Sequence, residues 1–338
     1  AYRACGINRI SFGLQSADNA ELAALGRIHT WETFLDSYGA ARRAGFTNIN
    51  IDLMSALPGQ TARTWEKTLR RILSLAPEHI SAYSLIIEEG TPFYEKYHED
   101  DLRRADGEQP RFLPSEEEER EMYVLTERLL GEAGLEHYEI SNYARPGYEC
   151  RHNIGYWRGA EYMGFGLGAS SFLRFYGREP EEPHCQVSYD RSAFLSDNAF
   201  VGVRFSNPVD FEEYDFFVRE RASEYVGIRA ETRAENHEAA WTEPQMESQA
   251  ESWAETQAEC LSVEDEMGEF MMLGLRMLSG VSEQDFLRRF HRPMDSVYGN
   301  TIARFCSLGL LERRNGRIFL TQRGMDLSNL VMAEFLPD

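Results

Sequence analysis

Three apolar strand patterns, separated by helical patterns, constrain the fold of this chain more than any other feature. The strand patterns cover Ile7–Gln15, Ile49–Asp52 and His79–Glu88. Their centres lie about 35 to 40 residues apart, a spacing typical of β/α units. The helical patterns cover 19–27, 33–44 and 63–75. Strand and helix in alternation predict an α/β fold with a parallel sheet.

Polar residues stand where two of these strands end, namely Gln15 and Asp52. In parallel α/β barrels the loops at the carboxyl ends of the strands converge on one rim, and the chemistry is located there. A closed barrel needs about eight strands, so three cannot close it. We therefore expect the C-terminal half of a partial (β/α) barrel. The chain opens on Ala1 and enters the first strand directly, so we expect it to be N-terminally truncated.

The rest of the chain divides by composition into further segments. We predict the barrel part at 1–114, with 88–114 irregular, and an α/β extension at 115–227. Glutamates recur nearly every fourth residue in 228–262, which predicts a disordered acidic segment. Three helical patterns and a hairpin around Asn315-Gly316 predict a small winged-helix-like domain at 263–338, with Thr321 capping a last helix.

Charge and cysteine content exclude several classes of partner. The formal net charge of -21 argues against non-specific nucleic-acid binding, and no apolar run approaches the ~20 residues of a membrane span. Five cysteines are scattered without metal-ligand spacing. This pattern favours a reducing cytoplasm over a disulfide framework.

The runs GINRISFGLQS, GRIHT and NINIDLMSALPGQT resemble the second half of the radical S-adenosylmethionine domain of the oxygen-independent coproporphyrinogen III oxidase family. The resemblance continues through YEISNYARPGYECRHNIGYWRGAEYMGFGLGASSF into the C-terminal region. HNIGYW fits the HNxxYW heme-binding pattern of the heme chaperone branch. The resemblance therefore implies a chaperone that delivers heme to haemoproteins, and a homodimer is the expected assembly. The alternative is a coproporphyrinogen III oxidase of porphyrin biosynthesis, so enzymatic activity stays open.

The family's S-adenosylmethionine site maps onto Gln15, Arg27 and Asp52. An amide, a guanidinium and a carboxylate suit a ligand that carries an ammonium, a carboxylate and a ribose. His29, in the same GRIHT run as Arg27, is placed to line the same rim. The alternative is that Gln15 and Asp52 only satisfy backbone groups of their loops.

HNIGYW places the heme candidates at His152, Asn153, Tyr156 and Trp157. His152 is the candidate ligand of the heme iron, Asn153 would orient the imidazole, and the two aromatic residues would pack beside the macrocycle. If the segment is helical, His152 and Tyr156 lie on one face. The alternative is a loop histidine bonded to a backbone carbonyl, with the aromatic residues as core anchors.

One family feature is missing from these 338 residues, namely the CxxxCxxC loop that holds a [4Fe-4S] cluster. Cys5 stands alone, so we expect the cluster only in a full-length parent and expect this chain by itself to be inactive in radical chemistry.

The run GFGLGA at 164–169, with Asp190 beyond it, matches the sequence pattern of a dinucleotide-binding turn. A strand pattern follows it where that turn requires a helix, so we do not predict a dinucleotide site here. A further alternative is a winged-helix interaction module with no small-molecule role.

Overall fold

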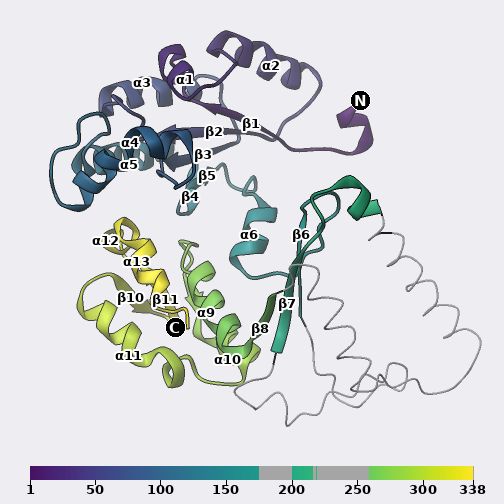
Figure 1. Ribbon diagram of the computed structural model, residues 1–338, viewed down its shortest axis with the longest axis vertical. Helices are drawn as coiled ribbons and strands as arrows, with labels where there is room; N and C mark the ends of the chain where they lie inside the picture. The colour runs from purple at the N-terminus through teal and green to yellow at the C-terminus, as the bar shows by residue number, and fades with distance from the viewer. Residues whose placement is uncertain (175–199, 216–217, 219–258, 338) are drawn as a thin grey trace, which may run out of the picture. The chain divides into compact units, whose positions relative to one another are not determined.

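The computed structural model describes residues 1–174, 200–215, 218 and 259–337 (Figure 1). The chain forms two compact units. Unit 1 comprises residues 1–154 and 276–279, and unit 2 comprises the remaining described residues. Asp190 and the acidic segment up to residue 258 lie outside the described residues. The prediction placed 259–262 in that segment as well, but they form strand β8 (Glu259–Ser262).

A five-stranded sheet in the order β1-β2-β3-β5-β4 is the framework of unit 1. β1 (Ile10–Gln15), β2 (Ile49–Ser55) and β3 (His79–Ser84) run parallel, which confirms the predicted α/β fold. β5 (Asn142–Ala144) and β4 (Glu136–Glu139) extend the sheet antiparallel. The sheet therefore continues past residue 114, where the prediction ended the barrel part.

The helices of unit 1 begin at polar caps. The capping side chains of three helices are Thr30, Thr61 and Ser115, each in a reciprocal capping box. After the short 3₁₀ turn Tyr2–Cys5, the helices are α1 (Asn19–Ala24), α2 (Trp31–Arg43), α3 (Ala62–Leu73), α4 (Pro92–Ala105) and α5 (Glu116–Glu132).

Helix α4 corrects the prediction that 88–114 is irregular. Thr91 caps its first turn and Pro92 occupies the first helical position, where a missing N–H costs nothing. The carboxylate of Asp100 on α4 accepts bonds from the backbone N–H groups of residues 111–113, and so secures the following loop. The glycines and Pro110 lie outside the helix, and Pro92 is tolerated at its first position.

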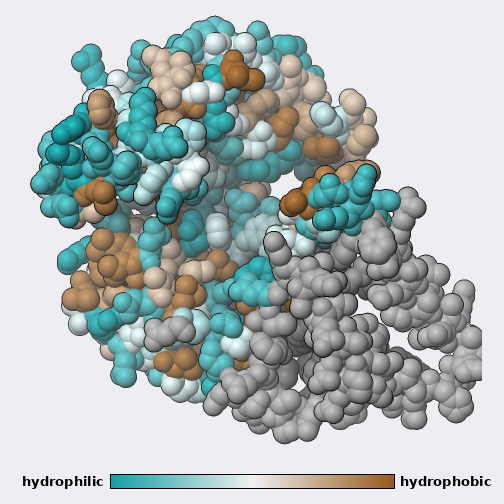
Figure 2. All heavy atoms as spheres, viewed as in Figure 1, coloured by the Kyte–Doolittle hydropathy of each residue, from teal (hydrophilic) through white to brown (hydrophobic). Residues whose placement is uncertain are grey.

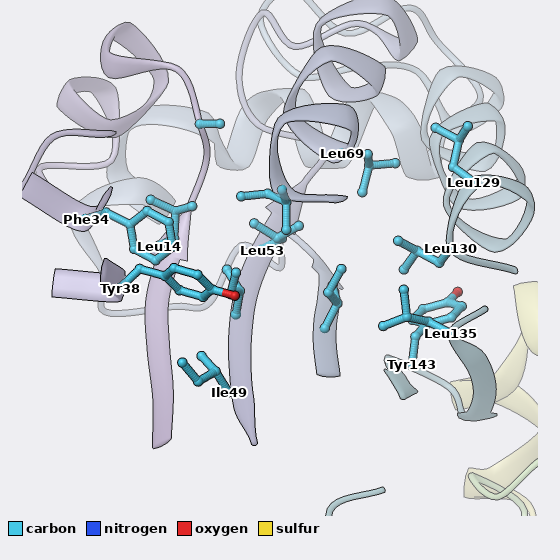
Figure 3. Close-up of a cluster of buried hydrophobic side chains, with 14 of the residues drawn as sticks. Leu14, Phe34, Tyr38, Ile49, Leu53, Leu69, Leu129, Leu130, Leu135 and Tyr143 are labelled. Carbon is cyan, nitrogen blue, oxygen red and sulfur yellow. The ribbon is translucent and has the colours of Figure 1, made fainter. Parts of the chain in front are cut away.

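One face of the sheet packs against the helices and forms the core of unit 1 (Figure 3). Leu14, Ile49 and Leu53 point from β1 and β2 toward Phe34, Tyr38 and Leu69 on the helices, in this close-up (Figure 3). Trp65 on α3 is fully buried, and its indole N–H donates to the hydroxyl of Thr126 at 2.8 Å. This face is thus built of apolar residues at alternate positions, as sheet packing requires.

Unit 2 contains a three-stranded antiparallel sheet, β6-β7-β8, made by β6 (Ser170–Arg174), β7 (Phe200–Ser206) and β8. A strand, not a helix, follows GFGLGA, as the sequence predicted. Glu266 on α9 (Val263–Gly274) is buried between two arginines, and accepts from Arg174 at 2.9 Å and from Arg289 at 2.6 Å. Pairing both carboxylate oxygens offsets the cost of burying this charge.

The C-terminal part has the winged-helix order of elements, as predicted. After α9 follow β9 (Val281–Ser282), α10 (Glu283–Phe290), α11 (Met294–Ser307), β10 (Leu311–Arg314), β11 (Arg317–Leu320), α12 (Gln322–Asp326) and α13 (Ser328–Ala333). Asn315 and Gly316 both have positive φ, which a tight hairpin turn requires, and Thr321 caps α12. Apolar side chains show on the surface over α11 to α13 (Figure 2), where Leu308, Leu327 and Leu330 are exposed.

Candidate functional site

The second face of the unit 1 sheet is polar, and we call it the polar face. It carries Ser11 on β1, Asn50 and Asp52 on β2, His79 and Ser81 on β3, and Asn142 on β5. Strands of parallel sheets are usually apolar on both sides, because both sides are covered by packed elements. A sheet with polar side chains at alternate positions on one side therefore marks a surface built for something other than packing.

Gln15 lies at the carboxyl end of β1 in a backbone conformation that L residues rarely adopt, with φ of 73°. The N–H of Ser16 donates to the carbonyl of Leu14 at 3.0 Å, which makes a tight turn centred on Gln15. The Gln15 amide folds back over Gly13, since a Cβ at Gly13 would lie 3.2 Å from its Nε2. Strain of this kind tends to collect at functional sites.

Asp52 lies inside β2, which continues to Ser55, and not at the strand end that the sequence predicted. It lies directly beside Gly13, its register partner on β1. One oxygen of its carboxylate accepts from the hydroxyl of Ser11 at 3.0 Å, and the other accepts from the side-chain amide of Asn50 at 2.7 Å. A carboxylate has about four acceptor positions, so room for a ligand remains. Gly13 thus neighbours both predicted residues, because the Gln15 amide folds back over it and Asp52 is its register partner on β2.

Arg27 lies on the loop that follows α1, and its side chain is exposed. The same loop is attached to the end of β1, because the His29 ring bonds the carbonyl of Leu14 at 3.2 Å. Arg27 is therefore on a loop fixed near Gln15, but the structure shows no contact of its guanidinium with Gln15 or Asp52. The predicted roles of these three residues toward S-adenosylmethionine stay predictions.

His79 was missed by sequence reasoning and is the most buried ionisable group of the polar face, with 1% exposed. Its ring nitrogens bond the Asn50 side-chain carbonyl at 2.6 Å and the Tyr138 hydroxyl at 2.8 Å. Burial, with a smaller contribution from the charge of Arg9, lowers the pKa of His79 to about 3. His79 is therefore a neutral imidazole at physiological pH. The sequence signal that could have revealed His79 is the polar residue at every second position of β2 and β3.

Glu139 is a second buried group that the sequence did not single out, with 0% exposed. It accepts from the side-chain amide of Asn142, and Arg276 lies 3.8 Å from its other oxygen. Burial raises the pKa of Glu139, while Asn142 and Arg276 pull it down. Residues 276–279 belong to unit 1 through this pairing and through the bond from the Ile140 N–H to the Arg276 carbonyl at 3.1 Å.

Helix α6 (Arg151–Trp157) carries the predicted heme motif, so the segment is helical rather than a loop. His152 is exposed on its first turn, and Tyr156 lies four residues later on the same face. The Tyr156 ring packs edge-on against Tyr162, with centroids 4.7 Å apart. Asn153 and Trp157 are half-buried. The motif therefore combines an accessible imidazole with an aromatic neighbour held in place.

The residues that the structure describes do not fit an iron–sulfur cluster. Among the cysteines whose side chains the structure describes, Cys5 is exposed, Cys150 is buried and Cys306 is half-buried. No group of three or more His, Cys, Asp or Glu side chains in the described ranges is arranged to hold a metal ion. A cluster needs several thiolates in one place. Likewise, no helix within the described part of the chain is both long and apolar enough to cross a membrane.

Comparison with known proteins connects both units to one family. The Radical SAM superfamily model matches residues 1–72, and the HemN C-terminal domain model matches residues 261–327. The heme chaperone HemW of Lactococcus lactis is 32% identical over 332 residues, which cover 98% of this chain and 70% of the relative. HemW of Bacillus subtilis is 30% identical over 331 residues, with the same two shares.

A solved structure shares the fold. Coproporphyrinogen III oxidase HemN from Escherichia coli, a radical SAM enzyme, superposes with a TM-score of 0.63 and 18% sequence identity. The match covers 98% of this chain and 65% of HemN, so the chain spans about two thirds of that protein. An identity this low shows the fold alone. With the sequence matches to the two bacterial chaperones, the conclusion is that this chain belongs to the HemW heme chaperone family of radical SAM proteins.

Proposed function

We propose that this chain binds heme on helix α6 and hands it to haemoproteins. The observation that carries the proposal is the exposed His152, one helical turn before Tyr156, in a chain of the HemW family. Imidazole is a common axial ligand of heme iron, and an aromatic side chain suits the flat macrocycle. The role of His152 as the iron ligand, with Asn153, Tyr156 and Trp157 around the macrocycle, is part of this proposal.

Exposure of His152 suits a carrier better than a permanent heme protein. A cargo that must leave needs a ligand that an acceptor can displace, and a deeply buried imidazole would hold heme too long. Affinity differences between related complexes come mostly from the dissociation rate, so a solvent-accessible ligand favours release. We therefore expect hemin to bind and to transfer to an apo-haemoprotein within minutes.

We further propose that the end of β1 and the neighbouring part of β2 bind S-adenosylmethionine. The Gln15 amide folds back over Gly13, and Asp52 is the register partner of Gly13 on β2. Arg27 lies on the loop tied to the end of β1. A fixed carboxylate and a neighbouring amide suit the hydroxyl and ammonium groups of this ligand. Bound there with a reduced cluster, S-adenosylmethionine would supply radical chemistry, but no cluster ligands are arranged among the described residues.

The scattered cysteines remain our reason to place the protein in the cytoplasm, and a homodimer stays a prediction. The oxidase alternative rests on a shared fold, which many chemistries can use. The third alternative, an interaction module without a small-molecule role, is supported only by the winged-helix order of the C-terminal elements.

Hemin titration followed by Soret absorbance tests the proposal. We expect His152→Ala to weaken hemin binding by at least about tenfold, which corresponds to about 1.4 kcal/mol. The matched control is His291→Asn, which removes an exposed histidine from the end of α10 and keeps a residue that tolerates its φ of 54°. Equal hemin affinity of His152→Ala and the unmodified chain would refute the heme site. Consumption of coproporphyrinogen would instead favour the oxidase.

A further inference from the structure

A continuous chain of hydrogen bonds runs through unit 1 from the carboxylate of Asp52 to the first turn of α6. Asn50 donates to Asp52 at 2.7 Å, and the Asn50 carbonyl bonds His79 Nδ1 at 2.6 Å. His79 Nε2 bonds the Tyr138 hydroxyl at 2.8 Å. That hydroxyl accepts from the backbone N–H of Cys150 at 3.2 Å. Every member belongs to unit 1.

The donors in this chain all point the same way. The Asn50 amide donates to Asp52, so its carbonyl is left to accept, and His79 Nδ1 must carry the proton. His79 Nε2 is then an acceptor for the Tyr138 O–H, which in turn accepts from Cys150. Hydrogen bonds aligned head to tail polarise one another, so each strengthens the next.

Burial makes this arrangement specific rather than incidental. Asn50 and His79 are 3% and 1% exposed, and Ser81 adds a second donor to the Asn50 carbonyl at 3.1 Å. The neutral state of His79 keeps Nε2 able to accept, because a protonated ring would have two donors and no acceptor. Removing Asn50 or the Tyr138 hydroxyl leaves one ring nitrogen of His79 without the partner it now has.

The far end of the chain fixes the helix that carries His152. Cys150 is buried, and its carbonyl accepts from the N–H of Ile154 at 3.0 Å, so it stands at the start of α6. The Tyr138 hydroxyl takes up its N–H, one of the free donors at a helix start. His152 follows two residues later. Tyr138 therefore holds the turn from which the candidate heme ligand projects.

We propose that His79 and Tyr138 are positioning residues that orient the Asp52 carboxylate and the first turn of α6 together. This inference rests on the proposed function, because it assigns one connected support to the S-adenosylmethionine and heme sites. Its consequence is energetic linkage. A ligand that fixes Asp52 also fixes the chain of donors behind it, so the two ligands alter each other's affinity by the same factor.

The test compares two matched tyrosine variants. Tyr138→Phe deletes the hydroxyl that joins His79 to Cys150. Tyr143→Phe deletes the hydroxyl of a tyrosine that is more deeply buried than Tyr138, lies on β5, and has no hydrogen-bond partner for that hydroxyl among the described residues. Hemin affinity is measured by Soret titration with and without saturating S-adenosylmethionine. We expect a ratio of about fivefold for the unmodified chain and for Tyr143→Phe, and a ratio near one for Tyr138→Phe.

A merely structural role would lower the melting temperature of Tyr138→Phe and leave that ratio unchanged, which would overturn the inference. A ratio of one in the unmodified chain would overturn it too. If the unmodified chain binds no hemin at all, the proposed function fails first. Hydrogen exchange tests the hydrogen bond between Tyr138 and Cys150 without any ligand. The Cys150 amide should exchange slowly in the unmodified chain and in Tyr143→Phe, and faster in Tyr138→Phe. Rapid exchange of that amide in the unmodified chain would also refute the inference.

Discussion

The two faces of the unit 1 sheet differ in what holds them together. The face toward the helices is apolar, with Ile49, Ile51 and Leu53 of β2 fully buried. The polar face carries the alternate residues of the same strand, Asn50 and Asp52, in a connected set of hydrogen bonds. One strand thus contributes to a packed core on one side and to a candidate ligand surface on the other.

This difference separates stability from orientation. Burying apolar area contributes about 25 cal/mol per Å², without requiring one exact side-chain direction. A hydrogen bond contributes a net of about 1 kcal/mol, but it fixes the direction of both partners and is expensive to break when buried. We therefore expect the apolar face to dominate the free energy of unfolding and the polar face to control ligand geometry.

The largest effect is expected on the apolar face, from Trp65→Ala. This change removes a fully buried indole and leaves the Thr126 hydroxyl without the donor it now has, so the free energy of unfolding should fall by about 4 kcal/mol. Urea unfolding followed by circular dichroism measures it. A loss under about 1 kcal/mol would show that this face is not the main source of stability.

On the polar face, Asn50→Ala should lower the free energy of unfolding by about 3 kcal/mol, because it takes the acceptor from the buried His79 Nδ1 and one of two donors from Asp52. Ser11→Ala is the milder comparison, since its hydroxyl is only one of two donors to Asp52. The same urea experiment applies. Equal, small losses in both variants would mean that the polar face is no connected network.

Acid should weaken the polar face through His79. Its pKa is lowered from 6.5 to about 3 on folding, so the unfolded chain binds the extra proton first, and stability falls as the pH drops below about 6.5. Between pH 7 and pH 5 this group should account for a loss of about 2 kcal/mol. His79→Gln cannot titrate, and its stability should depend less steeply on pH over that interval. Parallel pH profiles would contradict the burial of a neutral His79.

The smallest effect is expected from Tyr143→Phe. Its hydroxyl is buried without a hydrogen bond among the described residues, and burial raises the pKa of Tyr143. Deleting such a group should change the free energy of unfolding by less than about 0.5 kcal/mol. Thermal unfolding of the two proteins side by side is sufficient. A loss above 1 kcal/mol would reveal a partner for the hydroxyl.

Local signals in the sequence were enough for much of the fold. Alternating strand and helix patterns predicted the parallel strands, and Asn315-Gly316 predicted the hairpin. Thr321 caps a helix as predicted, but this helix is α12, and α13 follows it as the final one. Helix α4 was missed because Gly and Pro residues around it outweighed the start signal Thr91-Pro92. The extension of the sheet by β5 and β4 depends on pairing between distant segments, which local patterns do not contain.

The candidate site divides in the same way. Gln15 could be predicted because it stands at the end of β1, whereas Asp52 was expected at a strand end but lies inside β2, beside Gly13 of the neighbouring strand. His79 and Tyr138 could not be predicted, because their roles depend on hydrogen bonds between residues 29 and 59 positions apart in the sequence. The polar residues at every second position of β2 and β3 show, in retrospect, where such partners had to be sought.

Imidazole rescue of the hemin complex tests the central claim, that α6 carries heme through His152, most directly. Hemin is added to His152→Ala with and without free imidazole, and the Soret band is compared with that of the unmodified chain. The account predicts that the band of the bound complex is lost in the variant and restored by imidazole. An unchanged Soret band in His152→Ala without imidazole would contradict it.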